Sequence, residues 1–442
     1  MDIQLSDHFT YRKLIRFAFP SIIMMIFTSI YSVVDGFFVS NFAGKTAFAA
    51  VNFTFPVLGI LGAVGFVFGT GGSAIIATTM GEDKPEEAKR QFSLFVWAAA
   101  IIGAFLAFAG FFVLRPILEL FGAEGELLEN CIFYGRINLI ALPAFTLQYA
   151  FQSLFVTAGK PKLGLHVTVA AGVTNIVLDA LFVGVCRLGL GGAAAATALG
   201  QCVGGIVPLI YFARENTSSL RLVKTSYDGR TLGRACTNGS SELMSSIAMS
   251  IVSMLFNYQL MKYAGENGVA AYGVMMYVGF VFVAIFIGFS VGTAPIISFH
   301  YGAGNHSELQ GLRKQSMMII SVISVGMLIL AFALARPFSK IFVGYNQELL
   351  EMTVQGFAVY SFSFLFSGIS IWASGFFTAL NNGGISALLS FTRSLLFETA
   401  AVMILPLIFG IKGIWLSVVI AEIFAAGLSM LFICLKKKKY HY

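Results

Sequence analysis

Twelve long apolar runs constrain this chain more than any other feature of its sequence. A helix needs about 20 predominantly apolar residues to cross a bilayer. Of all residues, 57% are hydrophobic and only 11% are charged, whereas a soluble domain carries roughly 25% charge. We therefore expect an all-α integral membrane protein with twelve transmembrane helices. Within a few residues, the runs cover 15–39, 49–79, 92–114, 131–157, 163–186, 191–213, 240–262, 270–299, 315–335, 352–378, 386–409 and 414–435.

Lys and Arg residues gather in alternate loops of this predicted chain. If the N-terminus is cytoplasmic, the cytoplasmic segments hold the basic groups around 12–16, 84–90, 160–162, 214–234, 313–314 and 436–439. Because cytoplasmic loops carry the excess of Lys and Arg, we expect both termini in the cytoplasm. The net charge of +7 comes from these loops, so it indicates no nucleic-acid partner. Membrane lipids with anionic headgroups are the natural partners of such loops.

The chain also repeats itself, because residues at positions i and i+221 match along its length. A duplicated unit of six spans places both halves in the same orientation, so their pseudo-twofold axis should lie along the membrane normal. We expect an N-terminal six-helix bundle over 1–213, a cytoplasmic linker over 214–239 and a C-terminal six-helix bundle over 240–442. The matches include Phe68/Phe289, Gly71/Gly292, Gly81/Gly302, Arg115-Pro116/Arg336-Pro337, Thr157-Ala158/Thr378-Ala379 and Gly192/Gly413.

Four of the polar residues within the apolar runs of the first half form a candidate site. Asn175 and Asp179 are four apart in the fifth run, so on a helix they share one face. Thr197 lies near the start of the sixth run and Asp35 near the end of the first. Since a helix rises by about 1.5 Å per residue, we expect the two acids and Thr197 at one depth, with Asn175 one turn deeper. A carboxylate at bilayer depth costs roughly 2.5 kcal/mol or more and usually faces a cavity or a partner.

Two carboxylates that meet in a low dielectric cannot both ionise cheaply, so they share a proton or hold a cation. With the amide of Asn175 and the hydroxyl of Thr197, the set suits a proton or a Na⁺-like ion that takes oxygen ligands. The structural alternative is a hydrogen-bonded cluster that only fixes helix packing. At the repeat offset, the partners in the second half are all apolar, which favours the functional interpretation: Phe256, Leu396, Ala400 and Val418.

These features together resemble the multidrug and toxin extrusion (MATE) family, in the multidrug/oligosaccharidyl-lipid/polysaccharide flippase superfamily. The resemblance rests on two six-span halves, Val33-Val34-Asp35, the Asn175/Asp179 spacing and Thr197, and it is nearest to the prokaryotic branch. It implies an antiporter of the bacterial plasma membrane that works as a monomer by rocker-switch alternating access. Such a protein exports amphipathic, often cationic small molecules in exchange for H⁺ or Na⁺.

The resemblance carries cation binding onto Asp35, Asn175, Asp179 and Thr197, which become the metal ligands if the ion is Na⁺; no other cofactor is implied. Some relatives use an acidic pair in the C-terminal half. Glu242 matches the first of that pair, but the tenth run has no Asp.

Four further charged residues of the second half are candidates for a substrate cavity. Glu242 lies near the expected start of the seventh helix, where an acid also favours the helix dipole. Arg393 and Glu398 lie deep in the eleventh run, which indicates an inter-helix ion pair or contact with substrate. Glu422 stands alone in the twelfth.

Two other classes of function fit the sequence less well. A flippase for lipid-linked precursors or polysaccharides would use a cavity lined by several Arg residues, yet only Arg136 and Arg393 lie within spans. An intramembrane enzyme would need a paired nucleophile and base or a metal set. The spans contain neither an HExxH nor a GxSxG pattern, so we expect no enzymatic activity.

Overall fold

The computed structural model describes residues 3–344 and 346–442. Within this part of the chain, all regular secondary structure is helical. Eleven helices are each long and apolar enough to cross a membrane, and a twelfth span is formed by two helices with a 49° bend between them. The predicted all-α architecture with twelve spans is therefore confirmed. The chain is a multi-pass membrane protein.

The first six spans form a bundle that we call the N-lobe, and its helices are interrupted by short π-helical turns (η). The spans are α1 (Tyr11–Phe38) with η1 (Val39–Ala43); α2 (Lys45–Gly62), α3 (Val64–Phe66), η2 (Val67–Gly71) and α4 (Gly72–Gly81); α5 (Pro85–Leu120); α6 (Gly125–Thr157); α7 (Pro161–Asp179) with η3 (Ala180–Val185); and α8 (Gly189–Ala213).

The remaining six spans form the C-lobe. Its first two spans are the arms of α9 (Gly229–Gly302), which turns back at Gly265, where φ is 61°. The others are α10 (His306–Val343); α11 (Gln347–Ser361) with α12 (Phe364–Ala379); α13 (Gly383–Phe391), η4 (Thr392–Phe397) and α14 (Glu398–Phe409); and α15 (Ile411–Tyr440).

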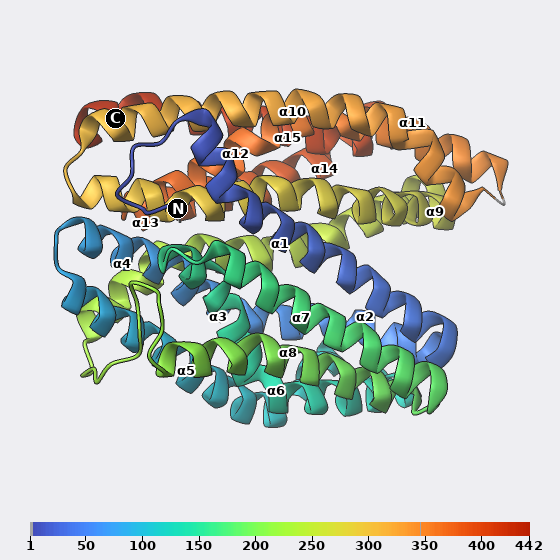
Figure 1. Ribbon diagram of the computed structural model, residues 1–442. Helices are drawn as coiled ribbons and strands as arrows, with labels where there is room; N and C mark the ends of the chain where they lie inside the picture. The colour runs from blue at the N-terminus through green and yellow to red at the C-terminus, as the bar shows by residue number, and fades with distance from the viewer. Residues whose placement is uncertain (1–2, 345) are drawn as a thin grey trace.

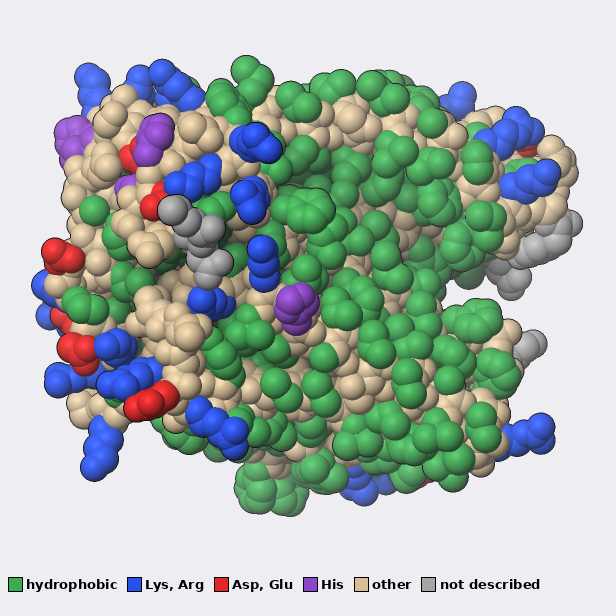
Figure 2. Space-filling model, viewed as in Figure 1, with side chains coloured by type: hydrophobic (Ala, Val, Ile, Leu, Met, Phe, Trp, Pro, Cys, Tyr) green, Lys and Arg blue, Asp and Glu red, His purple; other side chains and the backbone are tan. Residues whose placement is uncertain are grey.

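The two lobes lie side by side, with α1 running diagonally between them (Figure 1). Both chain termini lie at the same end of the molecule, which we call the termini end. Charged side chains gather at this end and apolar side chains cover the middle, as a membrane protein requires (Figure 2). At the opposite end the molecule is hollowed between the lobes (Figure 2). The lobes therefore meet at the termini end and part at the other.

Closure of the termini end depends on glycines that let backbones touch. A Cβ at Gly81 would lie 2.0 Å from the carbonyl oxygen of Phe299, and a Cβ at Gly302 would lie 2.1 Å from that of Thr78. Because Gly81 and Gly302 are equivalent positions of the repeat, the duplication itself supplies both halves of this contact. The Asn381 side chain adds a hydrogen bond to the Thr78 hydroxyl across the lobes, at 2.7 Å.

Three features depart from the sequence-based expectation. The first arm of α9 begins at Gly229, within the range expected for the linker, because Asp228 caps it by accepting from the backbone N–H groups of Arg230 and Thr231. The tenth span bends between α11 and α12 although no proline or glycine stands at the break. Finally, π-helical turns in the first, second, fifth and eleventh spans change the direction of the side chains that follow them.

Candidate cation and substrate site

Helices α1 and α7 of the N-lobe each carry an acid shortly before a π-helical turn. Asp35 stands four residues before η1, and Asp179 is the last residue of α7 before η3. Such turns occur frequently at functional sites, because the extra residue re-aims neighbouring side chains. The two acids therefore lie where the helices are locally distorted.

The structure brings the predicted residues together inside the N-lobe. Asp35 of α1 is an electrostatic neighbour of Asp179 of α7 and of Asn175, one turn earlier on the same helix. Asp179 is 0% exposed and Asn175 is 3% exposed. The acids of the first and fifth spans thus lie together; Asp179 is buried and Asp35 is half-buried.

Helix α8 approaches this pair closely. A Cβ at Gly200 would lie 3.0 Å from Cβ of Asn175, so the glycine lets α8 pack closely against α7 at the level of Asn175. Thr197, one turn before Gly200, lies within reach of the Tyr134 hydroxyl on α6, and Tyr134 interacts electrostatically with both acids. The fourth predicted residue therefore joins the site through an aromatic residue that sequence reasoning missed.

The oxygen atoms of this site are buried and unsatisfied. Oδ1 of Asp35, Oδ1 of Asn175 and both carboxylate oxygens of Asp179 have no hydrogen-bond partner among the described residues, and neither has the Thr197 hydroxyl. Ionised carboxylates and an amide oxygen are acceptors only, so they cannot satisfy one another. Since a buried unpartnered acceptor costs about 1–3 kcal/mol, this group is matched to a proton or to a small cation with oxygen ligands.

The charged residues of the C-lobe are arranged differently. Arg393, in η4, makes a two-pronged ion pair with Glu422 of α15, at 2.7 Å from Nη2 to Oε1 and 2.9 Å from Nε to Oε1. The Ser370 hydroxyl donates a further hydrogen bond to Glu422. Arg393 therefore forms an inter-helix pair, as expected. The expectation that Glu422 stands alone is wrong, because a residue of the preceding span provides its counter-ion.

Glu398 lies beside this pair without joining it. It is half-buried at the start of α14 and interacts electrostatically with Arg393, Glu422 and Tyr360. Since Glu422 is already paired with Arg393, Glu398 has no counter-ion of its own among the described residues.

Glu242 is half-buried and lies more than three turns into α9. Its placement near a helix start was therefore wrong, because α9 begins at Gly229, and the helix dipole does not explain this acid.

The repeat offset read from the sequence fails in the eleventh span. It pairs Asn175 with Leu396, which is 51% exposed, and Asp179 with Ala400, which is also exposed. An offset of 223, which is two residues longer, places Asn175 opposite Glu398 and Asp179 opposite the buried Val402. A π turn holds one extra residue, so η4 accounts for one of the two residues by which the register differs. The counterpart of Asn175 is therefore the acid Glu398 and not an apolar residue.

Sequence reasoning missed several polar residues around the N-lobe site. Tyr134 and Tyr31 both lie close to Asp35, and Tyr31 also contacts Gln148. Nothing in the spacing of fifteen tyrosines marks these two. Asn138 and Gln148 could have been found, since an amide in an apolar run is a signal of the same kind as Asn175.

The fold and this site together define a class of protein. Two six-span lobes close against each other at one end, part at the other, and enclose buried acids at membrane depth. Such acids mark ion and substrate pathways, so the class is a two-lobe membrane transporter.

Comparison with known proteins identifies the family within that class. The model of the MatE family matches the chain twice, at residues 20–181 and 243–404. The multidrug export protein MepA of Staphylococcus saprophyticus is 24% identical over 438 residues, covering 97% of this chain and 94% of the relative. MepA of Staphylococcus aureus (strain MSSA476) is 23% identical over 432 residues, with the same coverage.

Solved structures share the fold. A crystal structure of MATE in complex with MaL6 matches with a TM-score of 0.93 and 21% identity over 98% of each chain. An outward-facing conformation of a multidrug resistance MATE family transporter matches with a TM-score of 0.92 and 21% identity, over 98% of this chain and 97% of the other. This chain belongs to the MATE family of efflux transporters. The two family matches end at 181 in the fifth span and at 404 in the eleventh, and this difference of 223 is the offset that burial indicates there.

Proposed function

We propose that this protein is a secondary active multidrug exporter that exchanges amphipathic, cationic small molecules for H⁺ or Na⁺. One observation carries the proposal: Asp35 and Asp179, from different helices, meet in the N-lobe with buried oxygens that have no partner among the described residues. A cation or proton bound there would relieve both the repulsion and the unsatisfied acceptors. The multidrug export proteins named MepA, similar along nearly their whole length, support this choice of cargo.

Alternating access follows from the two-lobe arrangement. We assign the termini end to the cytoplasm because the basic loops lie there, so the hollow between the lobes faces outward. An ion that enters from outside binds the N-lobe acids. It drives the cycle only if it binds one conformation more tightly than the other, because equal affinity shifts no equilibrium. Residues of α1 are suited to transmit this difference, since α1 carries Asp35 and also contacts α9 of the other lobe extensively.

The substrate cavity is proposed to include the C-lobe acids. Glu398 has no counter-ion of its own among the residues described, and Glu242 is half-buried on the α9 arm. Tyr360 and Tyr272, which interact electrostatically with Glu398, add aromatic rings of the kind that organic cations favour.

Efflux from proteoliposomes tests the proposal. Ethidium transport would be measured with an imposed Na⁺ gradient at fixed pH, and then with a pH gradient without Na⁺, which also identifies the coupling ion. We expect one gradient to drive efflux in the wild type and neither to drive it in Asp35→Asn or Asp179→Asn. Equal amounts of folded protein must be reconstituted. Unchanged efflux in both variants would refute the assignment.

A flippase for lipid-linked precursors is the alternative from the same superfamily. A pyrophosphate-linked cargo would need free cationic side chains in the cavity. Arg393 is neutralised by Glu422, and Arg136 is exposed on the outside of α6. Binding of a lipid-linked sugar, compared with ethidium, would separate the two functions, and preference for the sugar would favour the flippase.

A further inference from the structure

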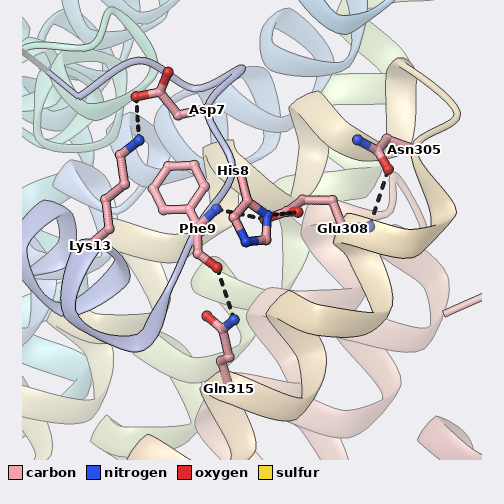
Figure 3. A network of polar contacts seen from close by, with 7 residues as sticks. All are labelled: Asp7, His8, Phe9, Lys13, Asn305, Glu308 and Gln315. Carbon is pink, nitrogen blue, oxygen red and sulfur yellow. Dashed lines mark hydrogen bonds and ion pairs between the residues drawn. The ribbon is translucent and has the colours of Figure 1, made fainter.

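Residues 3–10, which precede α1, dock on the C-lobe at the termini end, where His8 and Phe9 lie beside Glu308 and Gln315 (Figure 3). The Phe9 backbone N–H donates to Oε1 of Glu308 at 2.8 Å, and Nδ1 of His8 lies 2.6 Å from Oε2 of the same carboxylate. The side chain of Gln315, two turns further along α10, donates to the Phe9 carbonyl oxygen at 2.9 Å. Both backbone groups of Phe9 are therefore held by α10.

The docking is buried as well as polar. Phe9 is 0% exposed and Leu5 is 5% exposed, and both belong to the apolar core of the C-lobe. The Phe9 ring stands edge-on to the rings of Phe17 on α1 and His300 on α9. Glu308 is itself 8% exposed, and the Asn305 side chain caps the start of its helix. A segment without a role would not be expected to bury an aromatic ring and engage a nearly buried carboxylate.

The repeat supplies a second, reciprocal crossing. The segment before α9 docks on α5 of the N-lobe: the Val223 N–H donates to the Ser93 hydroxyl at 2.8 Å, and the Thr225 hydroxyl donates to the Arg90 carbonyl. Leu220 and Ala235 of this region are buried in an apolar cluster of the N-lobe. Helices α5 and α10 occupy equivalent places in the two halves, so each lobe holds the segment that leads into the other.

The two crossings differ in one respect that matters for motion. The segment before α9 joins α8 of one lobe to α9 of the other, so it is a tether whatever the conformation. Residues 3–10 lead into α1 of the N-lobe, and non-covalent contacts with Glu308, Gln315 and the apolar core hold them on the C-lobe. We infer that residues 3–10 are a releasable latch, seated on Glu308 and Gln315, that holds the termini end closed in the outward-facing state.

The role of the latch rests on the proposed alternating access, but its docking does not. Opening the termini end separates α4 from the second arm of α9, which are in contact through Gly81 and Gly302. While residues 3–10 are seated, the start of α1 is fixed to the C-lobe and resists that separation. Release shifts the population toward the inward-open form.

Hydrogen–deuterium exchange on the full chain in detergent or nanodiscs tests the latch without a transport assay. We expect a peptide over 3–16 to be protected in the wild type. In Glu308→Ala its exchange should rise at least tenfold, and exchange at the contacting ends, 72–81 and 292–302, should rise with it. Gln315→Leu should produce a smaller change in the same direction, and it replaces Glu308→Ala if that variant does not fold.

Glu87 provides a matched control. It is the counterpart of Glu308 in the repeat and lies in the first turn of α5, but it is exposed, and its hydrogen bond is to Gln91 of the same helix. Glu87→Ala should leave all three regions unchanged. The latch is refuted if residues 3–16 exchange at the rate of a free chain in the wild type. It is also refuted if Glu308→Ala frees that segment without affecting 72–81 and 292–302, or if Glu87→Ala has the same effect.

If neither the wild type nor any variant transports ethidium, but the exchange pattern is as expected, the proposed function is refuted and the latch is supported. If efflux is normal but residues 3–16 exchange like a free chain in the wild type, the latch is refuted and the proposed function stands.

Discussion

The two lobes derive from one repeated unit, yet the N-lobe leaves its buried acids without a basic partner and the C-lobe pairs one of its acids with an arginine. The N-lobe brings Asp35 and Asp179 together without a basic residue among their described neighbours, and their oxygens remain unpartnered. The C-lobe also places two acids close together within its spans, Glu398 and Glu422, but it supplies Arg393 as a counter-ion. In the proposed function, the N-lobe acids bind a positive ion from outside, whereas the C-lobe pair is neutralised by its own arginine.

This difference indicates a division of labour. A buried pair of acids is costly unless something positive arrives, so the N-lobe can couple its stability to ion binding. The C-lobe retains a single unneutralised acid beside tyrosines, which suits the weaker and less specific binding of a bulky organic cation. Four sets of variants test this difference between the lobes.

The largest effect is expected at the acid pair of the N-lobe. If Asp35 and Asp179 bind one ion as a unit, each Asn variant should lose about 100-fold or more of coupled efflux, and the double variant should lose no more than either single one. Residues that act together in this way are strongly non-additive. Efflux driven by the coupling gradient would measure this. Additive losses would show that the two acids act separately and would weaken the contrast between the lobes.

The second effect tests whether Arg393 is a counter-ion or a ligand for substrate. Arg393→Met leaves Glu422 buried without a counter-ion, and breaking a buried pair costs about 3–5 kcal/mol. Replacing both residues by Met should restore most of that stability. Thermal unfolding in detergent would measure both. Arg336→Met, in the exposed pair with Glu351, should change stability by about 1 kcal/mol or less. If the double variant is no more stable than Arg393→Met, the ion pair is not the reason for the loss.

Much of this comparison could be predicted from the sequence. Hydropathy predicted twelve spans because it reports which solvent a segment prefers. The rarity of acids in the spans singled out Asp35 and Asp179, which do meet. The pairing of Arg393 with Glu422 could not be predicted, because it depends on side-chain direction across two helices. The π turn η4 has no sequence signal, so the register of the eleventh span was misjudged and Glu398 was not recognised as the counterpart of Asn175.

The third effect concerns Glu398 as the acid that meets the substrate. Glu398→Gln removes its charge but keeps its size, so the KM for a cationic dye should rise about tenfold, equivalent to about 1.4 kcal/mol. A neutral substrate should be transported as before, and the dependence on the coupling ion should not change. Dose–response efflux with a cationic and a neutral compound would measure this. A changed ion dependence would place Glu398 in ion coupling and would remove the proposed division between the lobes.

The smallest effect is expected where α8 approaches the acid pair. A Cβ at Gly200 would lie 3.0 Å from Cβ of Asn175 and 3.1 Å from the carbonyl oxygen of Ala171, which is too tight without a shift of a few tenths of an ångström. Gly200→Ala should therefore displace the Asn175 amide and weaken the apparent affinity for the coupling ion a few-fold, about 1 kcal/mol or less. Gly427→Ala is the matched control, because Gly427 lies on the equivalent helix of the C-lobe with no described atom within 4 Å of its added Cβ. Equal ion affinities in the two variants would mean that Asn175 does not contact the ion. Asp35, Asp179 and Thr197 would then remain as the candidate ligands.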